Sequence, residues 1–197
     1  VAALGEMWQG GGKGHQNVIM VTLGTGVGGG IIVDGKIIAG SHGAGGELGH
    51  IHMNDDETDT CGCGNKGCLE QYASATGIVR MAKKKLATET RATKLTTFDP
   101  LTAKDIFDVA KENDEVALEL VDVLCTMLGT ALANVAAVAD PEIFVIGGGV
   151  SRAGDILIQG IQKKFEEKAF HACRGTGISL ATLGNDAGMY GCVRLLF

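Results

Sequence analysis

The sequence predicts an α/β domain in which a mixed β-sheet is flanked by helices. Asp34-Gly35 stands between two short apolar runs, and this dipeptide favours a tight hairpin because a type I′ turn needs positive φ at both central residues. Farther along, the apolar run 143–146 passes through a glycine triplet into a helical pattern that starts near 152. An early hairpin followed by strand–helix alternation combines antiparallel with parallel pairing, which indicates a layered α/β domain.

Hydrophobic periodicity and turn residues place the other elements in order. Thr102 with Asp105 resembles a capping box, and Asp114 stands where it can cap a long helix that Asp140-Pro141 ends. In chain order we expect a helix over 1–8, strands over 17–23, 31–33 and 36–39, a short strand over 50–53, helices over 74–88, 102–113 and 114–139, a strand over 143–146, a helix over 152–171, a strand over 178–182 and a helix over 187–196.

Composition narrows the class of protein and its partners. The 197 residues carry 17 basic and 23 acidic side chains, a net charge of −6, so no basic surface indicates binding to nucleic acid or to anionic lipid. The most apolar segment, 124–139, is shorter than a membrane span and contains polar residues, which favours a buried helix. Because three of the six cysteines share one loop with metal-ligand spacing, we expect a reducing compartment and a cytoplasmic protein.

The cysteine-rich loop carries the strongest chemical signal. Cys61, Cys63 and Cys68 follow His50 closely in the sequence, and three thiolates with one imidazole complete the tetrahedral shell that structural Zn²⁺ prefers. Three unrelated buried thiols are the alternative, but such close spacing favours a metal site. His52 is the rival ligand. If 50–53 is a strand, His50 and His52 face opposite sides, so one of them faces the thiols, and we favour His50.

Two glycine-rich segments are candidate phosphate or nucleotide sites. Segment 24–30 is no dinucleotide fingerprint, because a strand follows it instead of a helix, and it lacks the Lys-Ser/Thr ending of a Walker loop. The backbone N–H groups of its glycines could together bind an anion. The alternative is that the segment is a simple hairpin turn. Segment 147–149 follows a strand at the edge where open α/β sheets bind ligands, with close packing as the alternative. The candidate residues are Gly24, Thr25, Gly26, Gly28, Gly29, Gly30, Gly147, Gly148 and Gly149.

Several stretches spread along the chain form a larger pattern. They are Ala-Leu-Gly-Glu at 3–6, the glycine segment 23–30, Gly-Gly-Glu-Leu-Gly-His at 45–50, the cysteine block 61–70, Asp140-Pro141, Ile-Gly-Gly-Gly-Val-Ser at 146–151, and 184–191. Together they resemble the ROK family of sugar kinases and sugar-responsive repressors. The cysteine block with the preceding Gly-Glu-Leu-Gly-His is highly specific to that family. Within it, the chain most resembles the glucokinases of Gram-positive bacteria.

The resemblance implies an actin-like ATPase (ribonuclease H-like) fold of two lobes, with ATP, Mg²⁺ and sugar in the cleft between them. It implies that residues 24–30 face the ATP phosphates and that 147–149 lie beside the adenosine. Glu47, His50 and Glu70 are implied to reach sugar hydroxyls, with His50 bound to structural zinc as well. Carboxylates accept hydrogen bonds from hydroxyls, and a metal-bound imidazole keeps its second nitrogen free for one. We also expect a homodimer.

The family's catalytic base is an Asp directly before the helix that opens this chain, so the resemblance places the base upstream of Val1. We therefore expect residues 1–197 to be the C-terminal, larger lobe, with a zinc loop over 50–68, without the N-terminal lobe and without a catalytic residue of its own. The intact protein is expected to transfer the γ-phosphoryl of ATP to the 6-hydroxyl of glucose, and the 197-residue chain alone to be inactive. A sugar-responsive repressor, or a kinase for fructose, allose or an N-acetylhexosamine, stays open as an alternative.

Overall fold

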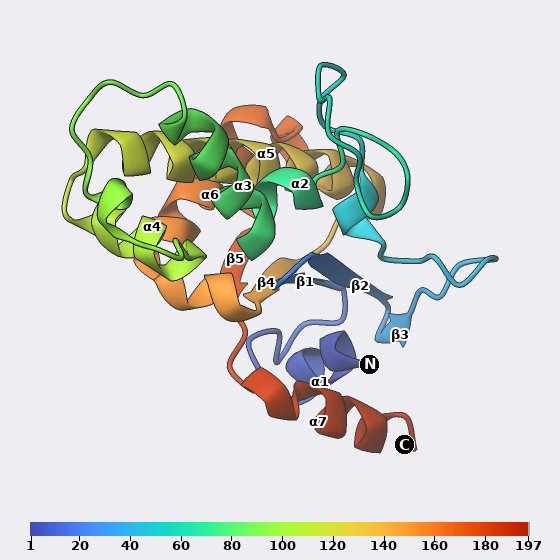
Figure 1. Cartoon of the computed structure of the whole chain (residues 1–197). Helices are drawn as coiled ribbons and strands as arrows, with labels where there is room; N and C mark the ends of the chain where they lie inside the picture. Colours follow the sequence, from blue (N-terminus) through green and yellow to red (C-terminus); the bar gives the residue numbers. More distant parts are fainter. Residues whose placement is uncertain (197) are drawn as a thin grey trace.

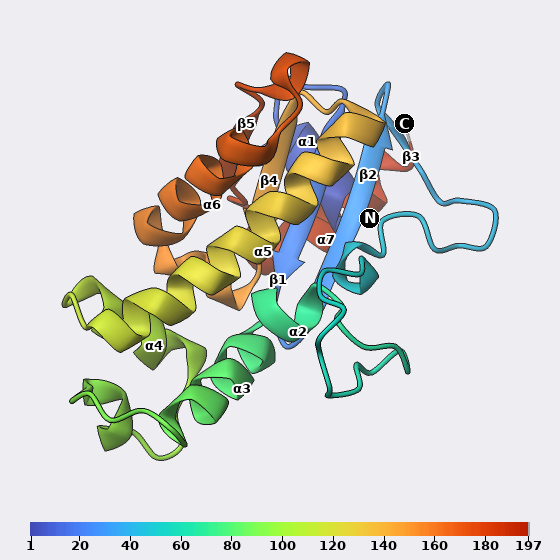
Figure 2. The same cartoon turned by 90° about the horizontal axis from the view of Figure 1, so that it is seen from above.

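The computed structural model describes residues 1–196 and contains one mixed sheet. Its strands are β1 (Val18–Leu23), β2 (Val27–Val33), β3 (Lys36–Ile37), β4 (Ile143–Gly147) and β5 (Gly177–Leu180). They stand in the order β3-β2-β1-β4-β5, as Figures 1 and 2 show. The pairs among β1, β2 and β3 are antiparallel, whereas β1–β4 and β4–β5 are parallel. The predicted mixed α/β sheet is therefore confirmed.

Helices cover both faces of this sheet (Figure 1). On one face, α1 (Ala2–Gln9) and α7 (Ala187–Arg194) pack against each other. The layer on the other face contains α2 (Glu70–Ala73), α3 (Ala75–Leu86), α4 (Ala103–Lys111), α5 (Glu115–Ala139) and α6 (Asp155–Lys168). Short 3₁₀ turns complete the chain: η1 (Leu48–His50), η2 (Lys94–Thr97), η3 (Gly149–Ala153), η4 (His171–Cys173) and η5 (Gly184–Asp186).

The central strand β1 is buried on both faces because its side chains alternate between two cores. Ile19 and Val21 point into the larger core, which α3, α4, α5 and α6 share. Val18 and Met20 point the other way, into a smaller core beneath α1. The strand is therefore apolar except at Thr22, and the glycine turn that follows Leu23 lies at the carboxyl end of the strand.

The long helix α5 is the core helix of the larger layer. By length and composition it is the one helix in the described part of the chain that could cross a membrane, but 61% of its most apolar window is buried inside the domain. It ends at Asp140, which adopts a left-handed conformation with φ of 42°, and Pro141 follows. The prediction of a buried helix that stops at Asp140-Pro141 is confirmed.

Helix α5 begins at a cap that also fixes the preceding loop. The Asp114 side chain accepts hydrogen bonds from Ala117 N, Thr93 Oγ1 and Lys94 N, each 3.0 Å long. We expect Asp114→Ala to lower the free energy of unfolding by about 2 kcal/mol, the upper end for lost helix caps. Urea unfolding of the chain measures this change. Glu115→Ala, one residue along and 82% exposed, should stay within about 0.5 kcal/mol, and an equal loss in both variants would contradict the capping role.

Some predicted elements differ from the structure. Strand β2 starts at Val27, so Gly28, Gly29 and Gly30 lie in the sheet and not in a turn. Residues 50–53 are not a strand, because His50 ends the 3₁₀ turn η1 and His52 forms one isolated bridge with Cys68.

The helices predicted over 74–88 and 152–171 are also interrupted. Ser74 is extended and separates α2 from α3, and its side chain accepts a hydrogen bond from Gly77 N to cap α3. Gly154 has φ of 74°, which breaks the second segment into η3 and α6. The predicted capping box of Thr102 and Asp105 is present at the start of α4.

Candidate functional site

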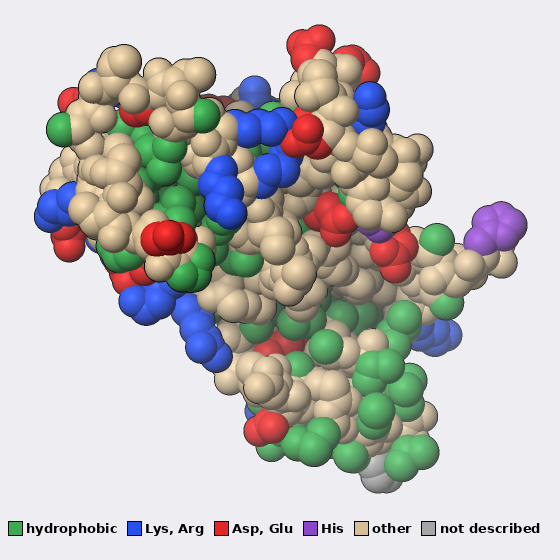
Figure 3. Space-filling view, in the orientation of Figure 1, with side chains coloured by type: hydrophobic (Ala, Val, Ile, Leu, Met, Phe, Trp, Pro, Cys, Tyr) green, Lys and Arg blue, Asp and Glu red, His purple; other side chains and the backbone are tan. Residues whose placement is uncertain are grey.

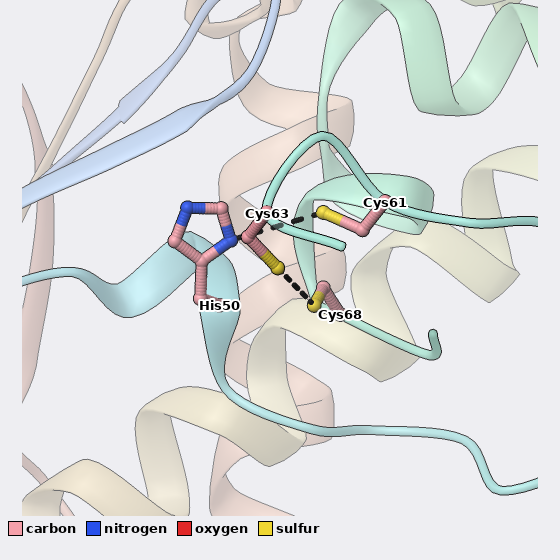
Figure 4. A group of neighbouring side chains, drawn as sticks. All are labelled: His50, Cys61, Cys63 and Cys68. Carbon is pink, nitrogen blue, oxygen red and sulfur yellow. Dashed lines mark hydrogen bonds between the residues drawn. The ribbon is translucent and has the colours of Figure 1, made fainter. Parts of the chain in front are cut away.

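The predicted metal ligands converge on one point. Figure 4 shows the His50 imidazole and the sulfurs of Cys61, Cys63 and Cys68 pointing toward one another. One ligand atom from each of these residues lies within 4.8 Å of all the others. His50 Nδ1 is 3.8 Å from Cys61 Sγ, and the sulfurs of Cys63 and Cys68 are 3.6 Å apart.

Backbone hydrogen bonds and glycines fold this loop tightly. Cys61 N donates to Asn65 O at 2.7 Å, and Gly64 N donates back to Cys61 O at 2.9 Å. Gly67 has φ of 73°, and a Cβ there would lie 2.0 Å from Asn54 O, so only glycine fits. The loop therefore brings three thiols together over a few residues without a disulfide, and all six cysteines of the chain are free.

The protonation of the thiols follows their surroundings. Burial raises the pKa of Cys61 to about 12, and burial also raises the pKa of Cys68. The backbone N–H of Asn65 lowers the pKa of the exposed Cys63 thiol. Cys61 and Cys68 therefore keep their protons at neutral pH unless a cation displaces them, as divalent metals do when they bind thiols.

His50, and not His52, stands at the thiols, although the reason differs from the predicted one. The prediction relied on a strand over 50–53, whereas the 3₁₀ turn η1 aims His50 at the cluster. His52 is engaged elsewhere, because its ring nitrogens lie 3.0 Å from Lys66 O and 2.8 Å from Asp55 Oδ1.

The three predicted sugar-binding residues form a continuous group. His50 Nε2 lies 4.0 Å from Glu47 Oε2, and His50 Nδ1 lies 3.9 Å from Glu70 Oε1. Glu70 opens α2 and accepts a hydrogen bond of 2.9 Å from Cys61 Sγ. The side chains of Glu47, His50 and Glu70 are 61%, 35% and 22% exposed, so each can still reach a ligand. The structure thus places two carboxylates and one imidazole where they can bind several hydroxyls together.

Glu70 also connects this group with the first glycine turn. A Cβ on Gly26 would lie 2.6 Å from Glu70 Oε2, so the turn and the carboxylate touch because residue 26 has no side chain. The same turn is fixed to α3: Ala75 N donates to Gly24 O at 2.8 Å, and Thr76 Oγ1 donates to Thr25 O at 2.5 Å. An open pocket of about 490 Å³ lies here, lined among others by Thr25, Gly26 and Glu70.

The other glycines of the first segment pack against protein atoms. A Cβ on Gly28 would lie 2.8 Å from Thr22 Oγ1, one on Gly29 would lie 2.5 Å from Gly46 O, and one on Gly30 would lie 2.8 Å from Ala3 Cβ. Since these residues pair with β1 in the sheet, the predicted glycine turn over 24–30 is wrong for 28–30, and the role of these three residues in binding phosphate stays a prediction. Only Gly24, Thr25 and Gly26 form the open turn.

The second glycine segment forms the turn that leaves β4. Gly148 has φ of 87°, and a Cβ there would lie 2.5 Å from Leu23 O, so this turn packs directly on the end of β1. A pocket of about 540 Å³ is lined by Gly147, Gly148 and Gly149 together with Thr22. Gly149 also borders a more apolar pocket of about 390 Å³, whose walls include Phe107 and Val150.

The two glycine turns lie side by side, because Gly148 packs on Leu23, the residue before Gly24, and a groove extends from both turns. A pocket of about 600 Å³ begins at Thr25 and shares Ala75, Thr102 and Ala103 with the apolar pocket beside Gly149. Sequence reasoning identified Thr102 only as a helix cap and missed Phe107 altogether. Nothing near either residue in the sequence indicates a position in the groove, because that position depends on how α4 packs on η3 and α3.

Comparison with known proteins identifies similar sequences and folds. The sequence model of the ROK family matches residues 1–196. A glucokinase from Halalkalibacterium halodurans is 47% identical over 195 residues, which cover 97% of this chain and 59% of that protein. A solved ROK family glucokinase from Streptomyces griseus, in complex with glucose and AMPPNP, is 39% identical with a TM-score of 0.86, covering 98% of this chain and 64% of that one. A xylose repressor from Caldicellulosiruptor bescii is 31% identical over 197 residues, covering 98% of this chain and 49% of the repressor.

The mixed sheet with helices on both faces is the fold of the actin-like ATPases, the class to which the solved sugar kinase belongs. Within that class, the chain belongs to the ROK family. It spans about 59% of the length of the Halalkalibacterium glucokinase.

Proposed function

We propose that this chain is the C-terminal, larger lobe of a two-lobed, ATP-dependent glucokinase that phosphorylates the 6-hydroxyl of glucose. The observation that supports it best is the contact between the hydroxyl-binding group and the nucleotide groove. Glu70 touches Gly26, the turn where the groove begins. A sugar held by Glu47, His50 and Glu70 would therefore lie next to the phosphates of a nucleotide in that groove. Phosphoryl transfer depends mainly on such positioning.

The two glycine turns suggest separate roles in this groove. Gly24, Thr25 and Gly26 would offer backbone amides and a hydroxyl to the phosphates of MgATP. Gly147, Gly148 and Gly149 would lie beside the adenosine, where Phe107 and Val150 give the base an apolar surface. Gly28, Gly29 and Gly30 would support the turn from the sheet.

The cluster of His50, Cys61, Cys63 and Cys68 fits structural zinc. Three thiolates and an imidazole make a complete tetrahedral set with no open position. The cation would hold the loop in shape, and His50, bound through Nδ1, would keep Nε2 for a sugar hydroxyl or for Glu47. The metal would not touch the transferred phosphoryl group.

The base that deprotonates the sugar hydroxyl would come from the part of the protein that precedes Val1. The 197-residue chain alone should then have essentially no kinase activity. With its free cysteines it suits a reducing cytoplasm, and we infer a homodimer for the intact protein.

A sugar-responsive repressor is the second candidate, and the similarity to the xylose repressor favours it. A sensor needs the hydroxyl-binding group but no nucleotide, so the groove that extends from the two glycine turns favours the kinase. A kinase for another hexose would use the same three side chains, and only the greater similarity to a glucokinase favours glucose.

Glu70→Gln in the full-length protein tests the proposal. We expect kcat/KM for glucose to fall about 10- to 100-fold, the loss of one hydrogen bond between a hydroxyl and a charged group. A coupled assay of ADP formation measures it, with Glu112→Gln as the control, because Glu112 is exposed, pairs with Lys94 and lines none of the pockets described above.

Three results would contradict the proposal. An unchanged kcat/KM in the Glu70 variant would remove this carboxylate from the sugar site. Phosphorylation of another hexose in place of glucose would favour the other kinases. Failure of the wild-type protein to phosphorylate any hexose, together with sugar-dependent binding to DNA, would favour the repressor.

A further inference from the structure

A partly buried ion pair joins the cysteine loop to helix α3, away from the four candidate metal ligands. Glu57 belongs to the acidic part of the loop, yet its side chain is only 6% exposed. Its Oε2 accepts hydrogen bonds of 2.7 Å from both Tyr72 Oη and Arg80 Nη2. The Arg80 guanidinium holds the pKa of Glu57 well below its usual range. This carboxylate is therefore an anchor and not part of a solvated acidic surface.

Arg80 contacts the loop and α2 at the same time. Its Nη1 donates to Asp59 Oδ2 at 2.5 Å, and its Nη2 also donates to Gln71 O at 3.0 Å. The guanidinium lies 5.7 Å from the centre of the Tyr72 ring. Figure 3 shows basic and acidic side chains side by side on the face where the loop meets the helices. A single planar side chain thus binds two loop carboxylates and one helix carbonyl.

The network reaches the proposed sites through Gln71. Its Nε2 donates to Asp59 O at 3.0 Å, and its Oε1 accepts from Cys68 N at 3.0 Å. Gln71 directly follows Glu70, the carboxylate that touches Cys61 and the glycine turn. Displacing Arg80 would therefore affect the backbone on both sides of the cysteine cluster and the start of α2.

Arg80 could instead be an anion ligand, because it borders the pockets beside Thr25. Its hydrogen bonds argue against this. Both Nη atoms are engaged with Glu57, Asp59 and Gln71, and Nε is buried with no partner among the described residues. Arg80 and Lys84 together balance the two carboxylates of Glu57 and Asp59, so this cluster has no excess positive charge for a phosphate.

We propose that Arg80, paired with Glu57, is a positioning residue that holds the cysteine loop against α2 and α3, so that the metal ligands and Glu70 are arranged before the metal binds. The proposal rests on the zinc site proposed above. A preformed site binds more tightly than one that must be ordered, and residues that support metal ligands typically contribute about 10- to 100-fold in affinity.

Competition with a chromogenic chelator measures the zinc affinity of the 197-residue chain. We expect Arg80→Gln to bind zinc about 10- to 100-fold more weakly than the wild type. Arg80→Lys should rescue little, because one ammonium cannot replace the three directed hydrogen bonds. Arg91→Gln is the matched control: Arg91 binds Glu119 through two hydrogen bonds of 2.7 and 3.0 Å, on a surface remote from the loop.

Because Arg80→Gln leaves Glu57 with only Lys84, 3.5 Å away, as its counter-charge, the variant could fail to fold. Tyr72→Phe is the milder test, since it removes only the hydroxyl that binds Glu57 and Asn54, and it should weaken zinc binding several-fold in a chain with wild-type circular dichroism. Wild-type affinity in Tyr72→Phe and in folded Arg80→Gln would overturn this inference. Absence of zinc binding in the wild-type chain would instead overturn the proposed metal site.

Discussion

Glu6→Gln is expected to lower the free energy of unfolding by about 3 kcal/mol, a large share of the roughly 5–15 kcal/mol typical of a domain. Glu6 is completely buried in α1. Its carboxylate accepts hydrogen bonds from Gly11 N at 2.7 Å, Thr182 N at 3.0 Å and Leu183 N at 2.8 Å. In glutamine one oxygen becomes an NH₂ group, so whichever way the amide points, a donor faces at least one backbone donor.

The three hydrogen bonds of Glu6 also show which part of the fold they stabilise. They connect α1 with the segment that precedes α7, and these two helices form the layer on one face of the sheet. Urea unfolding of Glu6→Gln measures the loss. Glu166→Gln, on the exposed side of α6, is the control and should change stability by less than about 0.5 kcal/mol. A loss below about 1 kcal/mol for Glu6→Gln would show that the three hydrogen bonds contribute little beyond what water supplies.

Removal of the proposed zinc should have a comparable effect. We expect about one zinc per chain in freshly purified protein and its loss in Cys61→Ser. A cation present at about 1,000 times its dissociation constant stabilises the folded state by about 4 kcal/mol. At this chain length that corresponds to about 8–16 °C in the midpoint of thermal unfolding. Elemental analysis and thermal unfolding, with and without a chelator, measure the two quantities.

Cys192→Ser is the matched control, because Cys192 is exposed on α7 and far from the cluster in the sequence. It should keep the metal and the wild-type midpoint. Freshly prepared, unchelated wild-type protein without zinc would contradict the metal site. Zinc retained in Cys61→Ser would show that Cys61 is not needed to hold it.

Local signals in the sequence predicted most of the fold. The Asp34-Gly35 hairpin, the capping box at Thr102 and the cap at Asp114 each depend on a few neighbouring residues, and all three are present. The glycines at 28–30 misled the prediction because glycine usually marks a turn. Here they are needed for close approach of Gly46 and Ala3 to β2, and this contact depends on distant parts of the chain.

In the candidate site too, contacts within one short segment could be predicted from the sequence, whereas contacts between distant segments could not. Spacing in the sequence was enough to bring together His50, Cys61, Cys63 and Cys68, because one short loop holds most of them. The sequence spacing could not indicate that Glu57 is buried, because its partner Arg80 lies 23 residues farther along the chain. Contacts of this kind depend on how α3 packs beside the loop.

The contact between Gly26 and Glu70 has a consequence for how such proteins diverge. Any side chain at 26 would overlap the present position of the carboxylate at 70 and would push it away from Cys61 and His50, which it now contacts. If the turn binds the phosphoryl donor and residue 70 binds the acceptor, as proposed above, a substitution at 26 would alter the acceptor site together with the donor site. Relatives that bind a different phosphoryl acceptor through a changed residue 70 would tolerate a side chain at position 26 more readily.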